Sequence, residues 1–481
     1  MIPIKLEDLA RITEGRVLRG DLSQLILSIS TDSRTLQPGD LYVSLRGERF
    51  DGHDFIWEAV SRGAMGFLTS RSYAELSSGQ KGVPGDESAA QSNISSTRSQ
   101  KGDLAIIQVR DCLAALQALA REVRNRSSYR TIGLTGSTGK TSTKDFLKSI
   151  LAKRFKVWAT PKSYNNEVGL PLTILGADSQ DEILIAELGM RGEGQIAQLC
   201  EILRPDMGIV TRIGPVHLET LGSEDRIARA EGELVEAIPE TGLVVLNRDD
   251  RWFPSMADKA RGRVVSYGMD SEAEVRATDI KLDAEARPSF QLVSGDRRTL
   301  VKLQVMGEHN VANALAAAAL ADELGVSMEE IKGGLQGAQL SDMRMEMVRV
   351  DGIRIINDAY NANPMSMKAA LKTLSHMGKR ARTIALLGDM LELGEKTVYY
   401  HREIGREVVE QKIDFLIAMG ELSKYIYEAA LEAGLEQKRA LLVDSLEDAA
   451  KEIKKILSSG DVLLIKASRA IGLERVLERI A

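Results

Sequence analysis

The stretch Ile132-Gly133-Leu134-Thr135-Gly136-Ser137-Thr138-Gly139-Lys140-Thr141 decides the class of fold. It completes the apolar run Thr131–Thr135, which predicts a buried strand, and the segment Thr143–Leu151 that follows has the pattern of a helix. Glycines between a strand and a helix let backbone N–H groups surround phosphate oxygens, and the helix N-terminus adds a favourable dipole. Only two residues separate Gly136 from Gly139, where the common phosphate loop has four, but the strand and the helix stand where the motif requires them. This stretch therefore predicts a nucleoside triphosphate site.

The residue types of the loop predict which part of the nucleotide or its metal each residue contacts. The Lys140 ammonium is expected to contact the β- and γ-phosphates, and the Thr141 hydroxyl is expected to ligate Mg²⁺. The residues that we predict to bind the nucleotide here are Gly136, Ser137, Thr138, Gly139, Lys140, Thr141 and Ser142.

Strand-like apolar runs without alternation continue along the chain, as expected for strands that helices cover on both faces. One series comprises Ile183–Glu187, Gly208–Thr211, Leu243–Asn247 and Val264–Tyr267, and the helix His309–Leu324 closes it. A second series, from about Met343, comprises Ile353–Asn357, Thr383–Leu387, Phe415–Met419, Ala440–Val443 and Val462–Ile465. We predict an α/β protein with a small α/β domain (1–110), a central phosphate-loop domain with a parallel sheet (111–338), and a Rossmann-like doubly wound domain (339–481).

Within the first domain, Leu25–Ile29 and Leu41–Leu45 are predicted strands, and Asp54–Arg62 and Asp111–Asn125 are predicted helices. The segment Ser77–Gly102 is rich in Ser, Gly, Gln and Asn, and we predict that it is a flexible insertion.

Length and composition limit the function classes. The chain has 481 residues, of which 43% are hydrophobic, and 63 basic against 69 acidic residues give a net charge of −6. Without a basic excess, nucleic acid is not an expected partner. The two cysteines, Cys112 and Cys200, have no metal-site spacing and are expected to be reduced. We expect a cytoplasmic protein, with no membrane insertion, that acts as a monomer.

The phosphate loop alone leaves two other nucleotide-binding classes open, a switch GTPase and a small-molecule kinase. Asn247-Arg248-Asp249-Asp250 imitates the guanine-reading motif of a switch GTPase, but the strand after the loop ends in Glu187-Leu188-Gly189 rather than leading to Asp-x-x-Gly. A small-molecule kinase also remains open, although 481 residues are many for one.

Further segments of distinctive composition follow in a fixed order. They are Ser30-Thr31-Asp32-Ser33-Arg34, Leu45-Arg46-Gly47, Asp51-Gly52-His53-Asp54-Phe55, Asn165-Asn166-Glu167-Val168-Gly169, Ala186-Glu187-Leu188-Gly189, His217-Leu218-Glu219, Gly307-Glu308-His309-Asn310, Asn357-Asp358-Ala359-Tyr360-Asn361-Ala362-Asn363-Pro364, Gly388-Asp389-Met390 and Lys466-Ala467-Ser468-Arg469. In these segments the chain resembles the Mur ligase family, along nearly its whole length apart from Ser70–Asp103. Within the family it is most similar to the ligases that add D-alanyl-D-alanine to UDP-N-acetylmuramoyl-tripeptide.

The resemblance implies a reaction and its ligands. ATP would convert the terminal carboxylate of the tripeptide to an acyl phosphate, which the amino group of D-alanyl-D-alanine attacks, with two Mg²⁺ ions as cofactors. Sister ligases, either the tripeptide-forming enzyme or a folylpolyglutamate synthase, are the alternatives; the folate enzyme lacks the first domain.

The resemblance also implies site residues. Asn310 would contact adenine, Asp358 the ribose and Arg344 the phosphates, and Asn313 would also belong to the nucleotide site. Asn310 could alternatively, or in addition, be the N-cap of its helix. The implied substrate-binding residues are Ser30, Asp32, Ser33, Arg34, Arg46, Gly47, Asp51, His53, Asn165, Asn166, Glu167, Tyr360, Asn361 and Asn363.

Four residues are implied as metal ligands, and one of them departs from the family. Glu187, at the end of a strand, would join Thr141 at one Mg²⁺, and His217 would hold the second. Most Mur ligases carry a carbamylated lysine where this chain has Glu231, and no lysine lies between Lys162 and Lys259. A glutamate offers the same two hard oxygens on a shorter stem. We therefore expect Glu231 to supply this charge, directly or through water, so that Lys140, Glu187, His217 and Glu231 are the predicted catalytic residues.

Overall fold

The computed structural model describes residues 1–47, 49–78, 98–99, 102–269 and 272–480. Most of the predicted insertion, Ser77–Gly102, lies outside the described residues. Its described ends are regular: helix α3 (Tyr73–Ser78) precedes it, and β7 (Arg98–Ser99) pairs with β8 (Gly102–Asp103). Two compact units divide the chain; the first comprises Met1–Arg130, Trp158–Ala186 and Leu199–Arg204, and the second comprises the remainder.

The N-terminal sheet has five strands in the order β2-β9-β6-β5-β4. Their bounds are Arg16–Arg19, Ala105–Gln108, Gly66–Thr69, Leu41–Val43 and Ile29–Ser30. The predicted strand Leu25–Ile29 is wrong as a single element, because β3 (Leu25–Ile26) pairs with β1 (Ile4–Lys5) and only β4 joins the sheet. Leucine, isoleucine and aromatic side chains from the sheet and from helix α2 (Ile56–Ser61) form its core. The long helix α5 (Cys112–Arg126) follows β9.

The central sheet has nine strands in the order β11-β12-β10-β13-β14-β15-β16-β17-β18. Its first six are β10 (Arg130–Thr135), β11 (Val157–Ala159), β12 (Ile183–Glu187), β13 (Met207–Val210), β14 (Leu243–Asn247) and β15 (Arg263–Gly268). Strands β10, β13, β14 and β15 are parallel. Since β11 and β12 lie to one side of β10 and β13 to the other, the strand order reverses at β10, and ligands bind beyond the carboxyl ends of strands at such a point. The loop at Gly136 stands there.

Three antiparallel strands extend the central sheet and were not predicted. They are β16 (Val275–Leu282), β17 (Pro288–Ser294) and β18 (Arg297–Lys302). Strand β17 alternates buried and half-buried residues, so one face of the extension is open, unlike the doubly covered strands that the apolar runs mark.

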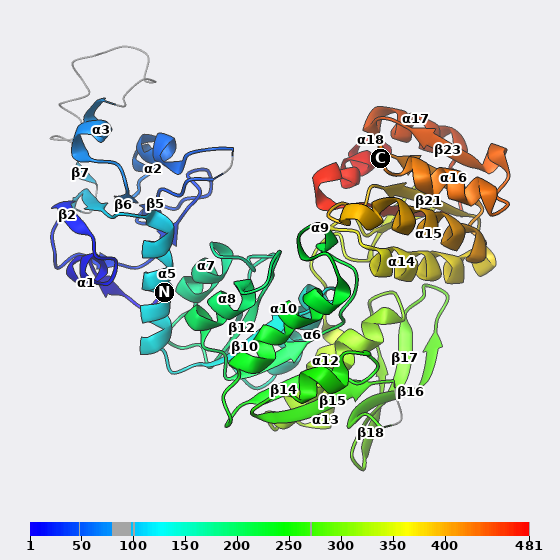
Figure 1. Cartoon of the computed structure of the whole chain (residues 1–481), viewed down its shortest axis with the longest axis horizontal. Helices are drawn as coiled ribbons and strands as arrows, with labels where there is room; N and C mark the ends of the chain where they lie inside the picture. The colour runs from blue at the N-terminus through cyan, green and yellow to red at the C-terminus, as the bar shows by residue number, and fades with distance from the viewer. Residues whose placement is uncertain (48, 79–97, 100–101, 270–271, 481) are drawn as a thin grey trace. The chain divides into compact units, whose positions relative to one another are not determined.

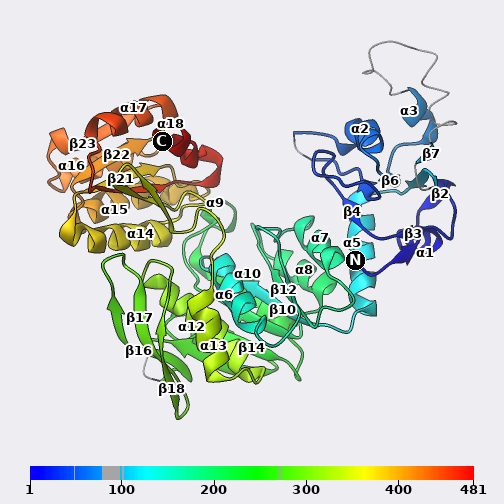
Figure 2. The ribbon, with the colours of Figure 1, turned by 180° about the vertical axis from the view of Figure 1, so that it is seen from behind.

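Helices cover the central sheet. The helix predicted from Thr143 begins at Lys140 in α6 (Lys140–Leu151), and α12 (His309–Glu323) packs against it. The other helices are α7 (Gly169–Gly176), α8 (Gln195–Leu203), α9 (Leu218–Leu221), α10 (Glu224–Ala237), α11 (Phe253–Ala257) and α13 (Met328–Gly337). Figure 2 shows α6, α12 and α13 from the side opposite to Figure 1.

The C-terminal sheet has six strands in the order β19-β20-β24-β21-β22-β23. They are Glu346–Val350, Ile353–Asn357, Val462–Lys466, Thr383–Gly388, Phe415–Met419 and Ala440–Val443, all parallel except β19. Helices α14 (Pro364–Met377) and α15 (Thr397–Glu410) lie on one face, and α17 (Leu446–Ile456) and α18 (Val476–Ile480) on the other (Figure 1); α16 (Lys424–Glu432) packs against α15. The three α/β sheets confirm the predicted fold class.

Two expectations from the composition concern the cysteines and membrane insertion. Cys112 and Cys200 are both buried, and neither is in a disulfide. Among the described residues, none of the helices has the length and apolar character needed to cross a membrane.

Candidate active site

The loop after β10 depends on two glycines in the left-handed region. Gly136 has φ 127° and Gly139 has φ 89°. A Cβ at position 136 would overlap the Thr211 hydroxyl, and one at position 139 would overlap the side-chain oxygen of Asn313 in α12. Both positions therefore require glycine. Asn313, predicted to bind the nucleotide, lies beside the loop.

The rest of the loop is fixed to the segment after β13. The Ser137 N–H donates to the carbonyl oxygen of Arg212 at 2.8 Å, and the Ser137 hydroxyl oxygen accepts the Gly214 N–H at 3.0 Å. The backbones of Thr138 and Arg212 form an isolated antiparallel β-bridge, and Ser142 is buried in the first turn of α6. The Lys140 ammonium donates to the carbonyl of Gly136. The loop is thus held in shape by the protein itself.

Two oxygen donors meet at the start of α6. The Thr141 hydroxyl donates to Glu187 Oε2 at 3.1 Å, and both residues are buried, with 3% and 1% of their surface exposed. Mg²⁺ prefers oxygen ligands and is commonly bound by one or two protein groups together with substrate phosphates. The Thr141–Glu187 pair fits such an ion beside a nucleotide.

Lys144 is a buried cation at this site that the sequence analysis missed. Its ammonium lies 3.5 Å from Glu187 Oε1 and 3.3 Å from Asp145 Oδ1. One pattern could have found it, because Lys144 follows Lys140 by one helical turn and residues at this spacing share a helix face.

Arg344, predicted to contact the phosphates, lies beside Thr141 at the start of α6. Its Nη2 donates to the Thr141 hydroxyl at 2.8 Å. The guanidinium lies over the Tyr360 ring at 4.2 Å from the centroid, and Arg469 lies over the same ring at 5.9 Å. Tyr360, predicted to bind substrate, therefore contacts two arginines, one of which is bound to the phosphate loop.

His217 lies in a left-handed conformation (φ 51°) before α9. Its Nδ1 is 2.5 Å from Glu392 Oε2, and this hydrogen bond lowers the pKa of the Glu392 carboxyl. Arg191 lies 3.6 Å from the same carboxylate. No hydrogen bond or ion pair joins His217 to Glu187 or Glu231 in the described ranges.

Glu231, on α10, faces the beginning of the phosphate loop. It is 2% exposed, and its Oε2 accepts the Gly136 N–H at 2.8 Å and the Thr135 hydroxyl at 2.5 Å. Of the four predicted metal ligands, the structure brings Thr141 and Glu187 together. Within the described part of the chain, no group of three or more His, Cys, Asp or Glu side chains could hold a metal without further ligands.

Asn310 is 1% exposed near the start of α12. Its Nδ2 donates to the Met306 carbonyl at 2.7 Å, and its Oδ1 accepts from Asn313 Nδ2 at 2.9 Å. Glu308, not Asn310, is the N-cap residue of the helix, so the predicted capping role is wrong. The helix begins two residues earlier than a cap at Asn310 would require.

A second buried lysine organises the end of β20 in the C-terminal sheet. Lys466, at the end of β24, is 2% exposed and lies 2.6 Å from Asp358 Oδ2; it also donates to the Asn361 carbonyl at 2.9 Å. The other carboxylate oxygen, Asp358 Oδ1, accepts the Met345 N–H at 3.2 Å. The Asn363 side chain caps α14 in a capping box. The predicted ribose and dipeptide residues are thus brought together, but several of their polar atoms stabilise the loop.

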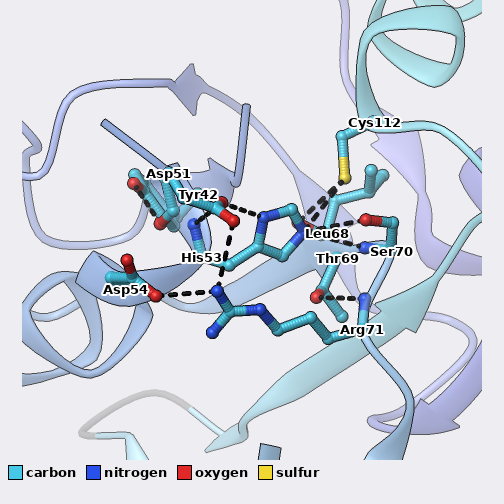
Figure 3. Close-up of polar contacts among 10 residues, drawn as sticks. Tyr42, Asp51, His53, Asp54, Leu68, Thr69, Ser70, Arg71 and Cys112 are labelled. Atoms are coloured by element: carbon cyan, nitrogen blue, oxygen red, sulfur yellow. Dashed lines mark hydrogen bonds and ion pairs between the residues drawn. The ribbon is translucent and has the colours of Figure 1, made fainter. Parts of the chain in front are cut away.

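In the first unit, Asp51 and His53 belong to a polar cluster (Figure 3). His53 Nδ1 lies 2.5 Å from Asp51 Oδ1, and its Nε2 accepts the Ser70 N–H at 3.1 Å. Arg71 binds Asp51 at 3.2 Å and Asp54 at 2.7 Å. Although burial alone would raise it, hydrogen bonds from His53 and the charge of Arg71 lower the pKa of Asp51. His53 is buried, and both of its ring nitrogens have partners within this cluster.

Other predicted residues of this unit lie at the end of β4 and in the loops that follow β4 and β5. Asp32 accepts from the Arg34 backbone and guanidinium at 2.8–2.9 Å, and the Ser30 hydroxyl donates to the Asp32 carbonyl at 3.1 Å. Ser33 is buried, the backbones of Arg46 and Asp51 form an isolated antiparallel β-bridge, and the Gly47 N–H donates to the Phe50 carbonyl.

The Asn165-Asn166-Glu167 segment also lies in this unit, before α7. Asn166 Oδ1 accepts the Gly169 N–H at 2.9 Å, and Gln117 donates to the Glu167 carbonyl at 3.1 Å. These two contacts hold the segment against α7 and α5.

A phosphate loop at the reversal of a parallel sheet, with an oxygen pair for a metal and an arginine from the segment before a second doubly wound sheet, defines a nucleotide-dependent enzyme of several domains. Three family models match the chain: "Mur ligase family, catalytic domain" over residues 25–124, "Mur ligase middle domain" over 134–321 and "Mur ligase, glutamate ligase domain" over 343–469. The chain belongs to the Mur ligase family.

Similar proteins share the whole length. The UDP-N-acetylmuramoyl-tripeptide–D-alanyl-D-alanine ligase of Bacillus subtilis (strain 168) is 33% identical over 480 residues, which are 99% of this chain and 98% of that protein. A crystal structure of MurF from Acinetobacter baumannii superposes with a TM-score of 0.84 at 29% identity, covering 99% and 98% of the two chains. MurF of Thermotoga maritima in complex with ADP gives 0.76 at 28% identity, covering 94% and 96%. These likenesses contradict the GTPase and kinase alternatives.

Proposed function

We propose that this protein is an ATP-dependent ligase that joins D-alanyl-D-alanine to UDP-N-acetylmuramoyl-tripeptide, the step that completes the pentapeptide precursor of peptidoglycan. The observation that carries the proposal is the likeness to ligases of this activity over 98% of the relative's length, with the phosphate loop intact. The reaction takes place in the cytoplasm, on a monomer, without nucleic acid or membrane insertion.

The chemistry follows from the loop. The tripeptide carboxylate attacks the γ-phosphate, so two anions must approach each other, and the main task of the protein is to neutralise charge. Lys140 and the backbone N–H groups at the start of α6 supply positive potential at the phosphates. Arg344, held beside Thr141, adds a second cation. The amine of D-alanyl-D-alanine then attacks the acyl carbon, and phosphate leaves with the carboxylate oxygen that had attacked it.

Thr141 and Glu187 would hold one Mg²⁺, and His217 and Glu231 a second one. When bound, Mg²⁺ supplies charge stabilisation at the transferring phosphoryl group. Glu231 contributes its carboxylate without carbamylation, and its bond to the Gly136 N–H fixes the loop at the same time. His217 would exchange its Glu392 contact for the metal.

The remaining roles follow the domains. Asn310 contacts the adenine, Asp358 the ribose, and Asn313 lies in the same nucleotide site. The uridine nucleotide and its peptide bind to residues of the first unit, namely Ser30, Asp32, Ser33, Arg34, Arg46, Gly47, Asp51, His53, Asn165, Asn166 and Glu167. Tyr360, Asn361 and Asn363 receive the dipeptide.

Phosphate release from ATP tests the function. Release should require both the UDP-muramoyl-tripeptide and D-alanyl-D-alanine, and mass spectrometry should detect the pentapeptide product. Tripeptides ending in lysine and in diaminopimelate are compared in parallel, which identifies the natural third residue. Phosphate release that proceeds equally without the dipeptide, or with neither tripeptide, would contradict the proposal.

A further inference from the structure

Lys144 is a buried cation for which the ligation chemistry has no direct use. Its side chain is 4% exposed, between Glu187 (1%) and Asp145 (11%). A lysine is almost never buried so completely unless it is paired, because removing an isolated ammonium from water is very costly. Lys140, one turn earlier, is half-buried and takes the place at the phosphates. Lys144 therefore acts on carboxylates, not on the nucleotide.

The distances describe a loose pair. The Lys144 ammonium lies 3.5 Å from Glu187 Oε1, whereas the other oxygen, Oε2, accepts the Thr141 hydroxyl at 3.1 Å. One oxygen of the Glu187 carboxylate thus faces the Lys144 ammonium. The other accepts a hydrogen bond from the Thr141 hydroxyl, which is itself a candidate metal ligand.

We propose that Lys144 is the resident counter-ion of Glu187. It holds the carboxylate beside Thr141 before any metal arrives, and it opposes the binding of a free divalent cation, so that the metal enters together with the nucleotide phosphates. This rests on the proposed function in one respect, that Glu187 ligates the metal.

Elementary electrostatics gives the direction. A divalent ion on Glu187 would stand within a few ångströms of the Lys144 ammonium, where like charges repel strongly in a low-dielectric interior. Nucleotide phosphates carry enough negative charge to offset that repulsion, but water does not. A bare ion is therefore disfavoured and a metal–nucleotide complex is accepted.

Asp145 gives Lys144 a second partner and connects the pair to the segment before β19. The Asp145 carboxylate lies 3.3 Å from Lys144 with Oδ1, and its Oδ2 accepts the Ser341 N–H at 2.8 Å and the Ser341 hydroxyl at 2.9 Å. Arg344, three residues on, donates to Thr141. When a metal takes the Glu187 charge, Lys144 keeps Asp145 as its counter-ion, so the ammonium stays paired.

The test measures Mn²⁺ binding to the full chain by electron paramagnetic resonance, without nucleotide. Lys144→Met should bind Mn²⁺ about tenfold or more tightly than the unchanged protein, because one nearby positive charge has gone. Lys144→Arg should bind like the unchanged protein. Lys148→Met, an exposed lysine one turn further along the same helix, is the matched control and should also leave binding unchanged. A folded Lys144→Met variant with unchanged Mn²⁺ affinity overturns the proposal.

A stability measurement covers the case in which Lys144→Met folds poorly. Removing one partner of a buried pair is far more harmful than removing both charges. The double variant Lys144→Met/Glu187→Gln should therefore unfold at higher urea than Lys144→Met alone. A double variant no more stable than the single one would refute the pairing.

A third arm separates this proposal from the metal assignment. Mn²⁺ with a non-hydrolysable ATP analogue should bind the unchanged protein and bind Glu187→Gln much more weakly. Equal binding would refute Glu187 as a metal ligand in the proposed function, whereas the urea comparison would still report on the Lys144 pair.

Discussion

Two lysine–carboxylate pairs with buried lysines lie at the carboxyl ends of strands in the central and C-terminal sheets, and their geometries differ. In the central sheet, Lys144 lies 3.5 Å from Glu187. In the C-terminal sheet, Lys466 lies 2.6 Å from Asp358 and also donates to two carbonyl groups, of Asp358 and Asn361. The tight Lys466–Asp358 pair fixes a loop. The loose Lys144–Glu187 pair leaves the Glu187 carboxylate beside the Thr141 hydroxyl, where a cation can bind to it.

The loops explain the difference. The central loop contains Gly136 and Gly139, whose left-handed backbones keep side chains out of the space above β10. The loop 358–363 has no glycine, and its polar atoms turn inward to Lys466, Met345 and the start of α14. The carboxyl ends of the strands thus form an open anion site at the phosphate loop of the central sheet, called the open edge below. In the C-terminal sheet they carry the loop 358–363, whose polar atoms bond within the protein, called the closed edge below.

The largest expected effect is at the open edge. Lys140→Ala should reduce ligation by on the order of 10³-fold, because it removes a cation from the transferring phosphate. Its urea midpoint should stay close to that of the unchanged protein. Steady-state phosphate release measures the rate, and Lys148→Ala on the same helix is the control. If Lys140→Ala turned over at nearly the rate of the unchanged protein, the phosphate-loop assignment would be contradicted.

The closed edge should respond in stability. Lys466→Met should lower the free energy of unfolding by about 3–5 kcal/mol, because it leaves Asp358 buried without its cation. Urea denaturation measures the loss, and Lys466→Met/Asp358→Asn should recover much of it. Exposed Lys454→Met should change stability by no more than about 0.5 kcal/mol. Should Lys466→Met keep full stability, the two edges would not differ as described.

Glu231 tests how the open edge is supported. Glu231→Gln should lose about 10²-fold in rate with folding intact, because the carboxylate on the Gly136 N–H and its charge are removed. Added bicarbonate should leave the unchanged protein equally active, since no lysine stands there to be carbamylated. Glu233→Gln, two residues on, serves as control, since Glu233 binds the N–H groups of Gly194 and Ala197 instead. Full activity of Glu231→Gln at low Mg²⁺ would exclude it from the site.

The smallest effect concerns Tyr360. Tyr360→Leu should raise the KM for ATP about threefold to tenfold, since stacking on the Arg344 guanidinium contributes about 1 kcal/mol. Tyr360→Phe should retain the ATP affinity because the ring face remains. If the KM for D-alanyl-D-alanine rises and that for ATP does not, Tyr360 serves the dipeptide rather than Arg344.

The sequence predicts the doubly covered strands well. Ile183–Glu187, Leu243–Asn247 and Phe415–Met419 have the predicted bounds, because continuous apolar runs mark strands buried on both faces. Strands β16–β18 were missed because their open face gives alternation instead. The phosphate loop could be predicted from local spacing, because its glycines shape the backbone of the same short segment in which they occur.

The buried pairs could not be predicted in the same way. Lys466 stood in a quoted segment without a role, and Lys144 was passed over, because their partners are 108 and 43 residues away in the chain. Their burial depends on packing between elements that no local pattern reports. Charged residues at strand ends and one turn into a phosphate-loop helix are therefore the positions where the structure adds most.

The most direct test of the account follows an oxygen atom. UDP-muramoyl-tripeptide labelled with ¹⁸O in its terminal carboxylate is incubated with the protein, ATP and D-alanyl-D-alanine, and the released phosphate is analysed by mass spectrometry. If the phosphate-loop edge activates the carboxylate as an acyl phosphate, each phosphate carries one carboxylate oxygen, so label appears in proportion to product. Unlabelled phosphate alongside normal pentapeptide formation would contradict the account.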